Sequence, residues 1–271
     1  MLKPGRVLYA GAMMGFGVLC VLYADFINQL QPIPAWMPGY RVLGVLNGGL
    51  LMAAGLAITL DRKACAAAIG IAGFFALWIV CLQVPSAFSN PSLLRSPWWI
   101  RTFESVALIG GALTLAGLTD SPIRESWIRR GRFAFGLSMP VFGVLHLIYP
   151  ESIAALVPPW YPWPMFWAYF TGVAQVAAGV AIASGVSARP ASILAGTMYG
   201  MWGLTLHIPR VWCRVAVPCG FVDIPTGFAA ARGGLTSLFV AFAMCGSAWI
   251  VSAGIAWIRE AELTEPAEVL R

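Results

Sequence analysis

Charged residues are scarce in this chain. Only 10% of its 271 residues are charged, whereas 59% are hydrophobic. A soluble domain carries about 25% charged residues. So few charges cannot cover the surface of a water-soluble fold, and the composition therefore indicates a protein whose apolar side chains face lipid.

Nucleotide and metal motifs are missing as well. The sequence contains no Walker motif, no Gly-x-Gly-x-x-Gly turn after a strand and no Gly-x-Ser-x-Gly elbow. It has only two histidines and no HExxH or CxxC spacing, although a metal site needs three or four ligands within reach. Nucleotide-driven pumping is therefore excluded within this chain, and we expect neither a nucleotide nor a metal as cofactor.

Long apolar runs take the place of these motifs. Stretches of about 18 or more apolar residues predict transmembrane helices, which need roughly that length to cross the hydrocarbon core. The fold class predicted is all-α, as a polytopic membrane protein. Eight such stretches occur, at 7–24, 41–60, 64–84, 103–119, 133–149, 164–184, 191–209 and 233–257.

The chain also repeats itself. When residues 34–85 are aligned with 158–209, a shift of 124, fifteen of the 52 positions are identical. With a shift of 126, Phe16 falls on Phe142 and Asp25 on Glu151. Shared Trp, Pro and Gly residues in the same order indicate a duplicated unit. The identical pairs include Pro34/Pro158, Trp36/Trp160, Pro38/Pro162, Gly48/Gly172, Gly55/Gly179, Trp78/Trp202 and Pro85/Pro209.

This duplication sets the domain organisation. We expect four-helix repeats at 1–119 and 133–257, a basic linker at 120–132 and a cytoplasmic tail at 258–271. Four spans are an even number, so the two repeats are parallel rather than inverted. Of the 17 Lys and Arg residues, eleven fall on the side of the termini and six on the other. The positive-inside rule then predicts an inner (plasma) membrane protein with both termini cytoplasmic, in contact with lipid and not with nucleic acid.

Small residues are dense in the second and sixth spans. Gly48, Gly55, Gly172 and Gly179 permit close approach of helices. We expect these glycines to mark packing seams, and we expect the second and sixth spans to lie inside the bundle.

Polar side chains gather at the outer ends of the spans in the second repeat. His146 and His207 stand where the first repeat has Cys20 and Gln83, which indicates a site in the second repeat and a scaffold in the first. Ionisable groups within a membrane are functional candidates, but near the interface they also serve as anchors, and both interpretations stay open. The candidate outer-leaflet pocket comprises His146, Tyr149, Glu151, Trp160, Gln175, His207 and Arg210.

Two of the six cysteines lie together in the last outer loop. Cys213 and Cys219 are on the oxidising side of the membrane in the predicted orientation. A disulfide between them is one of two interpretations, since spacing alone does not show the geometry.

Three motifs of the second repeat resemble the DoxX-like (DoxX/DoxD) family of bacterial integral membrane proteins. They are GVLHLIYPE at 143–151, VPPWYP at 157–162 and FWAYFTGVAQ at 166–175. The resemblance implies a four-helix unit, here duplicated. Some relatives are subunits of a thiosulfate:quinone oxidoreductase, and others are linked to redox stress or membrane-protein assembly. Many relatives carry Glu where this chain has Gln175, a difference that removes a proton carrier.

Three functions are compatible with these features. A non-enzymatic subunit or assembly factor of a membrane complex, with other subunits as partners, is favoured by the small-residue seams and the absent cofactor motifs. The alternatives are a quinone-linked oxidoreductase membrane subunit, with quinone as its cofactor, and a small-solute transporter. Whether the protein is an enzyme at all stays open at this point.

Overall fold

The computed structural model describes residues 1–27, 29–34, 36–89, 99–119, 123–215 and 228–268. In this part of the chain the structure is helical and contains no strand. The predicted all-α architecture is therefore confirmed. The elements in order are α1 (Leu2–Tyr23), α2 (Tyr40–Thr59), α3 (Ala64–Trp78), η1 (Ile79–Gln83), α4 (Val84–Ser89), α5 (Trp99–Leu118), α6 (Arg124–Ile148), α7 (Pro150–Ala154), α8 (Pro164–Ser184), α9 (Ala188–Trp202), η3 (Gly203–His207), α10 (Ile208–Val215) and α11 (Phe228–Glu268).

The molecule is a multi-pass membrane protein. Within the described residues, six helical segments are long and apolar enough to cross a membrane: Leu2–Tyr23, Tyr40–Thr59, Ala64–Phe88, Arg124–Ile148, Pro164–Ser184 and Ala231–Thr264. The predicted spans 103–119 and 191–209 are helical too, in α5 and in α9 followed by η3 and α10, but they are not among these six.

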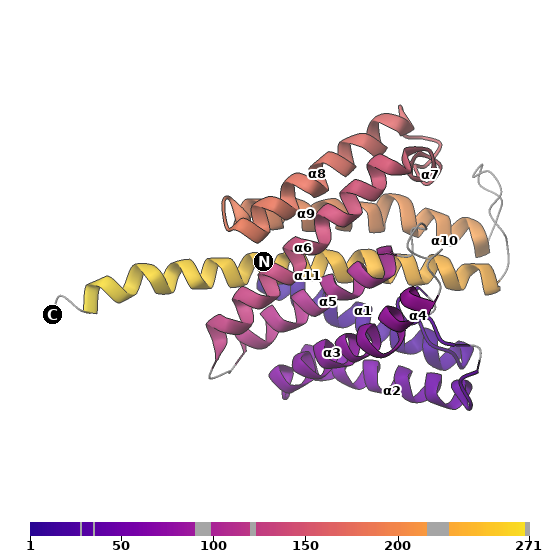
Figure 1. Cartoon of the computed structure of the whole chain (residues 1–271), viewed down its shortest axis with the longest axis horizontal. Helices are drawn as coiled ribbons and strands as arrows, with labels where there is room; N and C mark the ends of the chain where they lie inside the picture. The colour runs from indigo at the N-terminus through magenta and orange to yellow at the C-terminus, as the bar shows by residue number, and fades with distance from the viewer. Residues whose placement is uncertain (28, 35, 90–98, 120–122, 216–227, 269–271) are drawn as a thin grey trace.

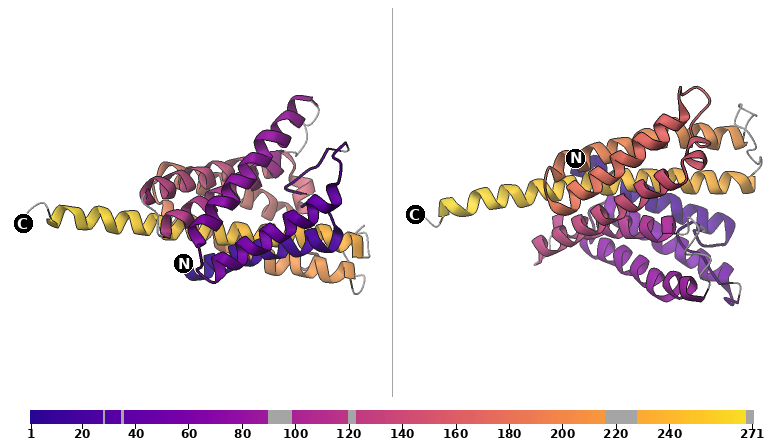
Figure 2. Two further views of the ribbon diagram at one scale, coloured as in Figure 1. Left: turned by 90° about the horizontal axis from the view of Figure 1, so that it is seen from below. Right: turned by 45° about the horizontal axis from the view of Figure 1, so that its top comes forward.

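Helix α11 forms the axis of the bundle. It packs against α1, α5, α6 and α9, and 72% of its most apolar window is buried. Figures 1 and 2 show it running through the whole bundle and continuing past it toward the C-terminus. A helix that is apolar on all sides is stable only where neighbours surround it.

The prediction that the second and sixth spans lie inside the bundle is wrong. Only 33% of the apolar window is buried in α2, and the same share in α8. Helix α2 packs against α1 and α3, and α8 against α6, α7 and α9, so both lie at the edges of the molecule (Figure 1). Their glycines face one neighbour each, while the opposite face of each helix is apolar and exposed, as suits contact with lipid.

The glycines themselves do form close seams. A Cβ added to Gly17 on α1 would lie 2.6 Å from the carbonyl oxygen of Gly48 on α2. A Cβ on Gly143 of α6 would meet the carbonyl of Gly172 on α8 in the same way. Only glycine allows two helix backbones to approach this closely, so these positions fix the pairs α1–α2 and α6–α8.

The first helix of each half packs against the last helix of the other half. Helix α1 packs against α11, and α6 packs against α5. Gly5 and Gly246 meet at the first of these contacts, and Gly131 and Gly110 at the second. The two halves of the chain are thus joined through the helix pairs α1–α11 and α5–α6.

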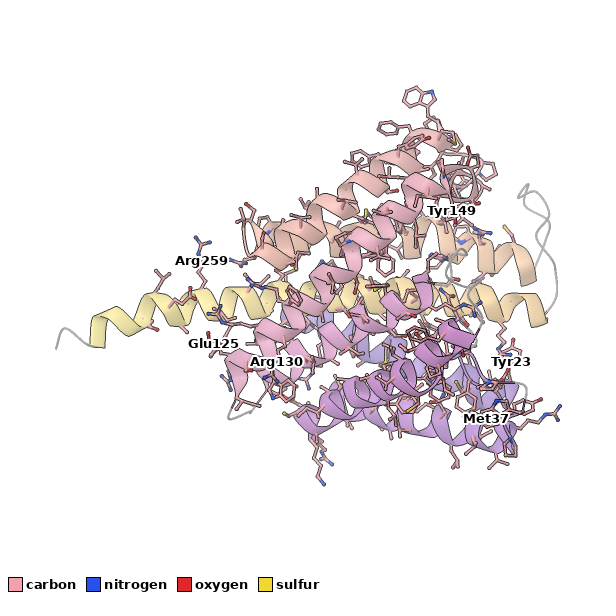
Figure 3. The ribbon with its side chains drawn as sticks, viewed as in Figure 1. Tyr23, Met37, Glu125, Arg130, Tyr149 and Arg259 are labelled. Carbon is pink, nitrogen blue, oxygen red and sulfur yellow. The ribbon has the colours of Figure 1, made fainter. Side chains whose placement is uncertain are left out.

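The two ends of the bundle differ in chemistry. Figure 3 shows Glu125, Arg130 and Arg259 at the end toward the C-terminus, whereas Tyr23 and Tyr149 lie at the opposite end. The candidate site is built at the end that carries Tyr149.

Candidate functional site

Two adjoining cavities lie at the end of the second half that carries Tyr149. The larger has a volume of about 680 Å³ and the smaller about 360 Å³. Both volumes fall in or near the range of small-molecule sites. We refer to the two cavities together as the chamber. The residues that line both of them are His146, Ile153, Leu156, Trp202 and His207.

His146 is oriented by a chain of hydrogen bonds. The Thr171 hydroxyl lies 2.7 Å from the carbonyl oxygen of Trp167 and 3.0 Å from His146 Nδ1. A hydroxyl has one proton; because it donates to the carbonyl, it accepts from Nδ1–H. His146 Nε2 is then an acceptor, 3.4 Å from the amide nitrogen of Gln175.

Gln175 extends this chain to the next helix. It is 1% exposed, and its Oε1 accepts from the hydroxyl of Tyr199 at 3.3 Å. Its side chain lines the larger cavity beside that of Tyr199. Buried polar groups that satisfy one another in this way hold a site rigid, so the imidazole of His146 has a fixed position and tautomer.

Aromatic rings complete the wall around His146. The ring of Trp202 stacks on the imidazole at 5.7 Å between centroids and 14° between planes. The ring of Tyr199 meets Trp202 edge-on at 5.5 Å. Such flat apolar surfaces with a few oriented polar groups are typical of sites for ring-shaped ligands.

His207 enters the chamber from a π-helical turn. The amide of Ile208 donates to the carbonyl of Gly203, five residues earlier. Short π-helical turns inside α-helices are frequent at functional sites. No sequence pattern predicted this turn, which ends at His207.

The smaller cavity reaches the lipid-facing surface. Two of the residues that line it, Phe170 on α8 and Met201 on α9, are 52% and 49% exposed. Tyr161 and Pro158 from the loop before α8 also line it. The loop is held by Trp167, whose Nε1 donates to the carbonyl of Pro162 at 3.0 Å. The smaller cavity is therefore bordered by side chains that are exposed on the outer surface of α8 and α9.

The first half of the chain contributes polar groups to the chamber. Gln29 and Glu104 line the larger cavity, although neither was among the predicted site residues. The sequence feature that points to Glu104 as a site residue is a carboxylate in an otherwise apolar span. The interpretation of the first repeat as scaffold alone is therefore too narrow, because the central helix α5 brings Glu104 to the junction of the two halves.

The predicted site residues are only partly brought together. Tyr149 lines the larger cavity with His146, Gln175 and His207. Glu151, Trp160 and Arg210 are outside the set of residues that line either cavity; Glu151 and Trp160 are exposed at the surface, and Arg210 lies on α10.

Cys213 is buried on α10, whereas Cys219 lies outside the described residues. The pairing of these two cysteines stays a prediction. Among the described residues no three His, Cys, Asp or Glu side chains are grouped closely enough to hold a metal ion.

Comparison of the chain with protein-family profiles, with curated proteins and with solved structures gives no match. The geometry of the chamber is therefore the basis for any functional assignment.

Proposed function

We propose that this protein binds a lipophilic ring compound of the quinone class in the chamber, as a quinone-binding membrane subunit. The observation that carries the proposal is the fixed His146, stacked on Trp202 and hydrogen-bonded through Thr171 and Gln175, in a cavity bordered by exposed apolar side chains. A quinone headgroup is a flat ring with hydrogen-bond acceptors. The flat ring matches the aromatic wall of the chamber. Because His146 donates through Nδ1 to Thr171 and accepts at Nε2, the imidazole itself offers no N–H to a quinone oxygen.

Membership of the DoxX-like family is part of the same proposal, as are eight spans in two parallel repeats. Matching helix bounds support the repeats. Helices α3 (Ala64–Trp78) and α9 (Ala188–Trp202) are offset by 124 residues, and so are the π-helical turns Ile79–Gln83 and Gly203–His207. We also propose an inner-membrane location with both termini cytoplasmic, from the distribution of Lys and Arg. A reporter fused to the C-terminus, active only on the cytoplasmic side, tests the orientation.

The alternative of a non-enzymatic subunit or assembly factor stays a prediction. Its sequence argument came from the small-residue seams, the lack of charges at the midplane and the absent cofactor motifs. The seams at Gly17, Gly48, Gly143 and Gly172 are occupied by helices of this same chain, so they do not point to a partner. We place the quinone proposal first because of the cavity beside His146.

Extraction from native membranes tests the proposal. The protein is purified gently, and bound quinone is measured by mass spectrometry and absorption. We expect stoichiometric quinone in the wild type. Affinity should fall at least tenfold, or about 1.4 kcal/mol, on His146→Ala or Trp202→Leu.

Trp160→Leu is the matched control, because Trp160 is 55% exposed and outside the chamber lining. It should bind quinone like the wild type. Quinone-free wild-type protein that also fails to take up added quinone contradicts the proposal. If a protein partner co-purifies reproducibly instead of quinone, the assembly role becomes the better supported function.

A further inference from the structure

Glu104 occupies an unusual position for a carboxyl group. It lies on α5, is 8% exposed, and lines the larger cavity of the chamber. The cavity wall around it is largely apolar, with Phe142, Leu145, Val240, Ala241 and Met244 among its residues. Burying a carboxylate in such surroundings is costly unless hydrogen bonds or a cation compensate it.

Gln29 is the residue that holds the Glu104 side chain. Its Nε2 lies 2.9 Å from one carboxyl oxygen of Glu104 and 3.1 Å from the other. On its far side, Gln29 Oε1 is 3.3 Å from the hydroxyl of Ser237. The carboxyl group is therefore anchored by a single amide nitrogen, in a fixed orientation at the cavity wall.

This anchor leaves acceptor capacity on the carboxyl group. A carboxylate offers about four lone-pair sites, more than one amide nitrogen can use. In the part of the chain that the structure describes, the ion pairs are Arg6–Asp61, Arg129–Glu125, Arg129–Glu262 and Arg232–Asp25, and Glu104 is in none of them. A hydrogen-bond donor from the chamber side would complete its environment.

We propose that Glu104 makes the chamber selective for a headgroup that donates a hydrogen bond, namely a hydroxylated ring such as a phenol or hydroquinone. In the ionised form of Glu104, an ether or carbonyl oxygen at the same place would set lone pairs against the carboxylate oxygens. The protonated form would instead donate to such an oxygen, so the selectivity applies to the ionised form. A site built to hydrogen-bond a hydroxyl rejects the analogue that lacks it, because its own polar group is then left unpaired. This inference rests on the proposed quinone-binding chamber and assigns the reduced form as the one bound more tightly.

A matched pair of ligands tests it without any redox chemistry. The probes are 4-pentylphenol and its methyl ether, 4-pentylanisole, which differ in one hydroxyl proton and one methyl group. Binding to the full-length protein in nanodiscs is followed by calorimetry, with decyl-substituted benzoquinone as a third probe. We expect the wild type to bind the phenol at least tenfold more tightly than the anisole.

The decisive variant is Glu104→Gln, which keeps the shape of the side chain and removes its charge. In this variant the preference for phenol over anisole should fall below threefold, with the anisole affinity unchanged or improved. Glu151→Gln is the control, since Glu151 is an exposed carboxylate near the same end of the bundle and outside the chamber lining. It should keep the wild-type preference.

The outcomes separate this inference from the proposed function. If the wild type binds benzoquinone but does not distinguish phenol from anisole, or if Glu104→Gln keeps the full preference, the role of Glu104 is refuted and the quinone proposal stands. If the wild type binds none of the three probes, the proposed function fails and the inference fails with it.

If Glu104→Gln does not fold, difference infrared spectroscopy on the wild type decides instead. The carboxyl band should shift on addition of phenol and not of anisole. An equal response to both probes refutes the inference.

Discussion

The two halves of the chain differ at the end of the bundle where the chamber lies. The difference is in how deeply their aligned apolar residues are buried. With a shift of 126 residues, Ile27 and Leu30 of the first half fall on Ile153 and Leu156 of the second. Ile27 and Leu30 are 3% and 0% exposed and belong to the hydrophobic core. Ile153 and Leu156 line both cavities of the chamber. Of these two aligned segments, one is packed in the core and the other borders a cavity.

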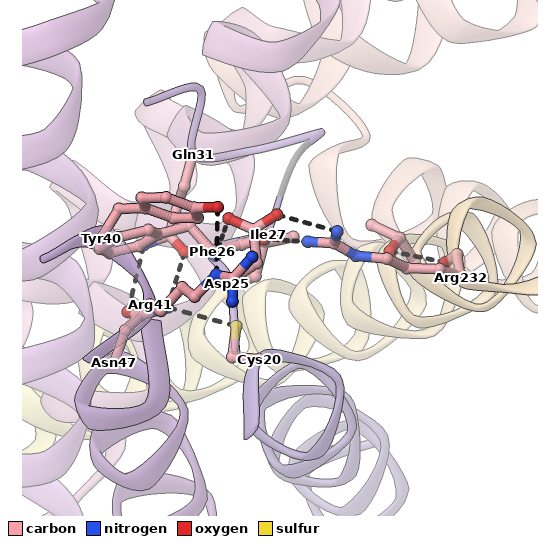
Figure 4. A network of polar contacts seen from close by, with 10 residues as sticks. Cys20, Asp25, Phe26, Ile27, Gln31, Tyr40, Arg41, Asn47 and Arg232 are labelled. Carbon is pink, nitrogen blue, oxygen red and sulfur yellow. Dashed lines mark hydrogen bonds and ion pairs between the residues drawn. The ribbon is translucent and has the colours of Figure 1, made fainter. Parts of the chain in front are cut away.

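The polar side chains of the two halves can be compared at the same aligned positions. In the first half, Asn47 and Gln31 exchange hydrogen bonds through their amides at 2.9 and 3.3 Å, and Asn47 reaches Cys20 Sγ at 3.3 Å (Figure 4). Gln83 donates to the backbone carbonyl of Leu30 at 2.7 Å. These three side chains thus bond to residues of the first half, just as His146, Thr171 and Gln175 bond to one another in the second.

In the second half, the counterparts of Cys20, Asn47 and Gln83 are His146, Thr171 and His207. Both histidines face a cavity.

An ion pair ties the closing segment of the first half to the central helix. Arg232 on α11 lies 2.9 Å from the carboxylate of Asp25 and donates to the carbonyl of Phe26 at 2.7 Å (Figure 4). Arg232 also stands over the ring of Tyr23, 4.9 Å from its centroid. This clamp holds the segment after α1 inside the bundle.

The largest effect is expected from one pair of leucines. Leu30→Ala should destabilise the protein by about 2–5 kcal/mol, because it opens a cavity in a packed core. Leu156→Ala should change stability by no more than about 0.5 kcal/mol, since Leu156 is 36% exposed and already borders a cavity. Thermal unfolding in detergent measures both.

Quinone binding should show the reverse order for the same variants. Leu156→Ala should weaken it several-fold, whereas Leu30→Ala should leave it unchanged in the protein that stays folded. Equal destabilisation by the two substitutions would mean that the halves do not differ in the way described.

The glycine seams should behave alike in both halves. Gly17→Val and Gly143→Val each push a side chain against a neighbouring backbone. Overpacking of this kind costs about 1–3 kcal/mol, and the two losses should agree within error in thermal unfolding. Gly11→Val and Gly49→Val are the controls, because a Cβ at either position meets nothing within 4 Å. A loss confined to one half would show that the two seams are not equivalent.

The fold was predictable to the extent that it follows from composition and periodicity. Apolar length predicted the helices, whereas the duplication and the eight spans stay predictions. What the sequence could not give was the central position of α11 and the outer position of α2 and α8. Small residues such as Gly48 mark a close contact on one face of a helix, and they carry no information about the opposite face, which here is exposed.

The site was predictable only for residues that stand out by type. His146, His207 and Gln175 were found because polar groups are rare in apolar spans. Trp202 and Tyr199 resemble ordinary core aromatics in the sequence, and only packing shows that they form the wall. Glu104 carries the same signal as a carboxylate in an apolar span, but its position beside the second half follows only from the packing of α5 against α6 and α11.

The smallest effect concerns the support of His146. Thr171→Val keeps the shape of the side chain and removes the acceptor for His146 Nδ1. A single hydrogen bond contributes about 0.5–1.5 kcal/mol, so quinone affinity should fall by about threefold to tenfold, with stability little changed. Thr197→Val is the matched control, because Thr197 donates to the carbonyl four residues earlier at 2.9 Å, as Thr171 does at 2.7 Å, but lies exposed and away from the chamber lining. If both variants weaken binding equally, the effect comes from helix α8 or α9 as a whole and not from the orientation of the imidazole. If only Thr171→Val does so, the orientation of His146 depends on Thr171, whereas the counterpart Asn47 bonds to the side chains of Gln31 and Cys20.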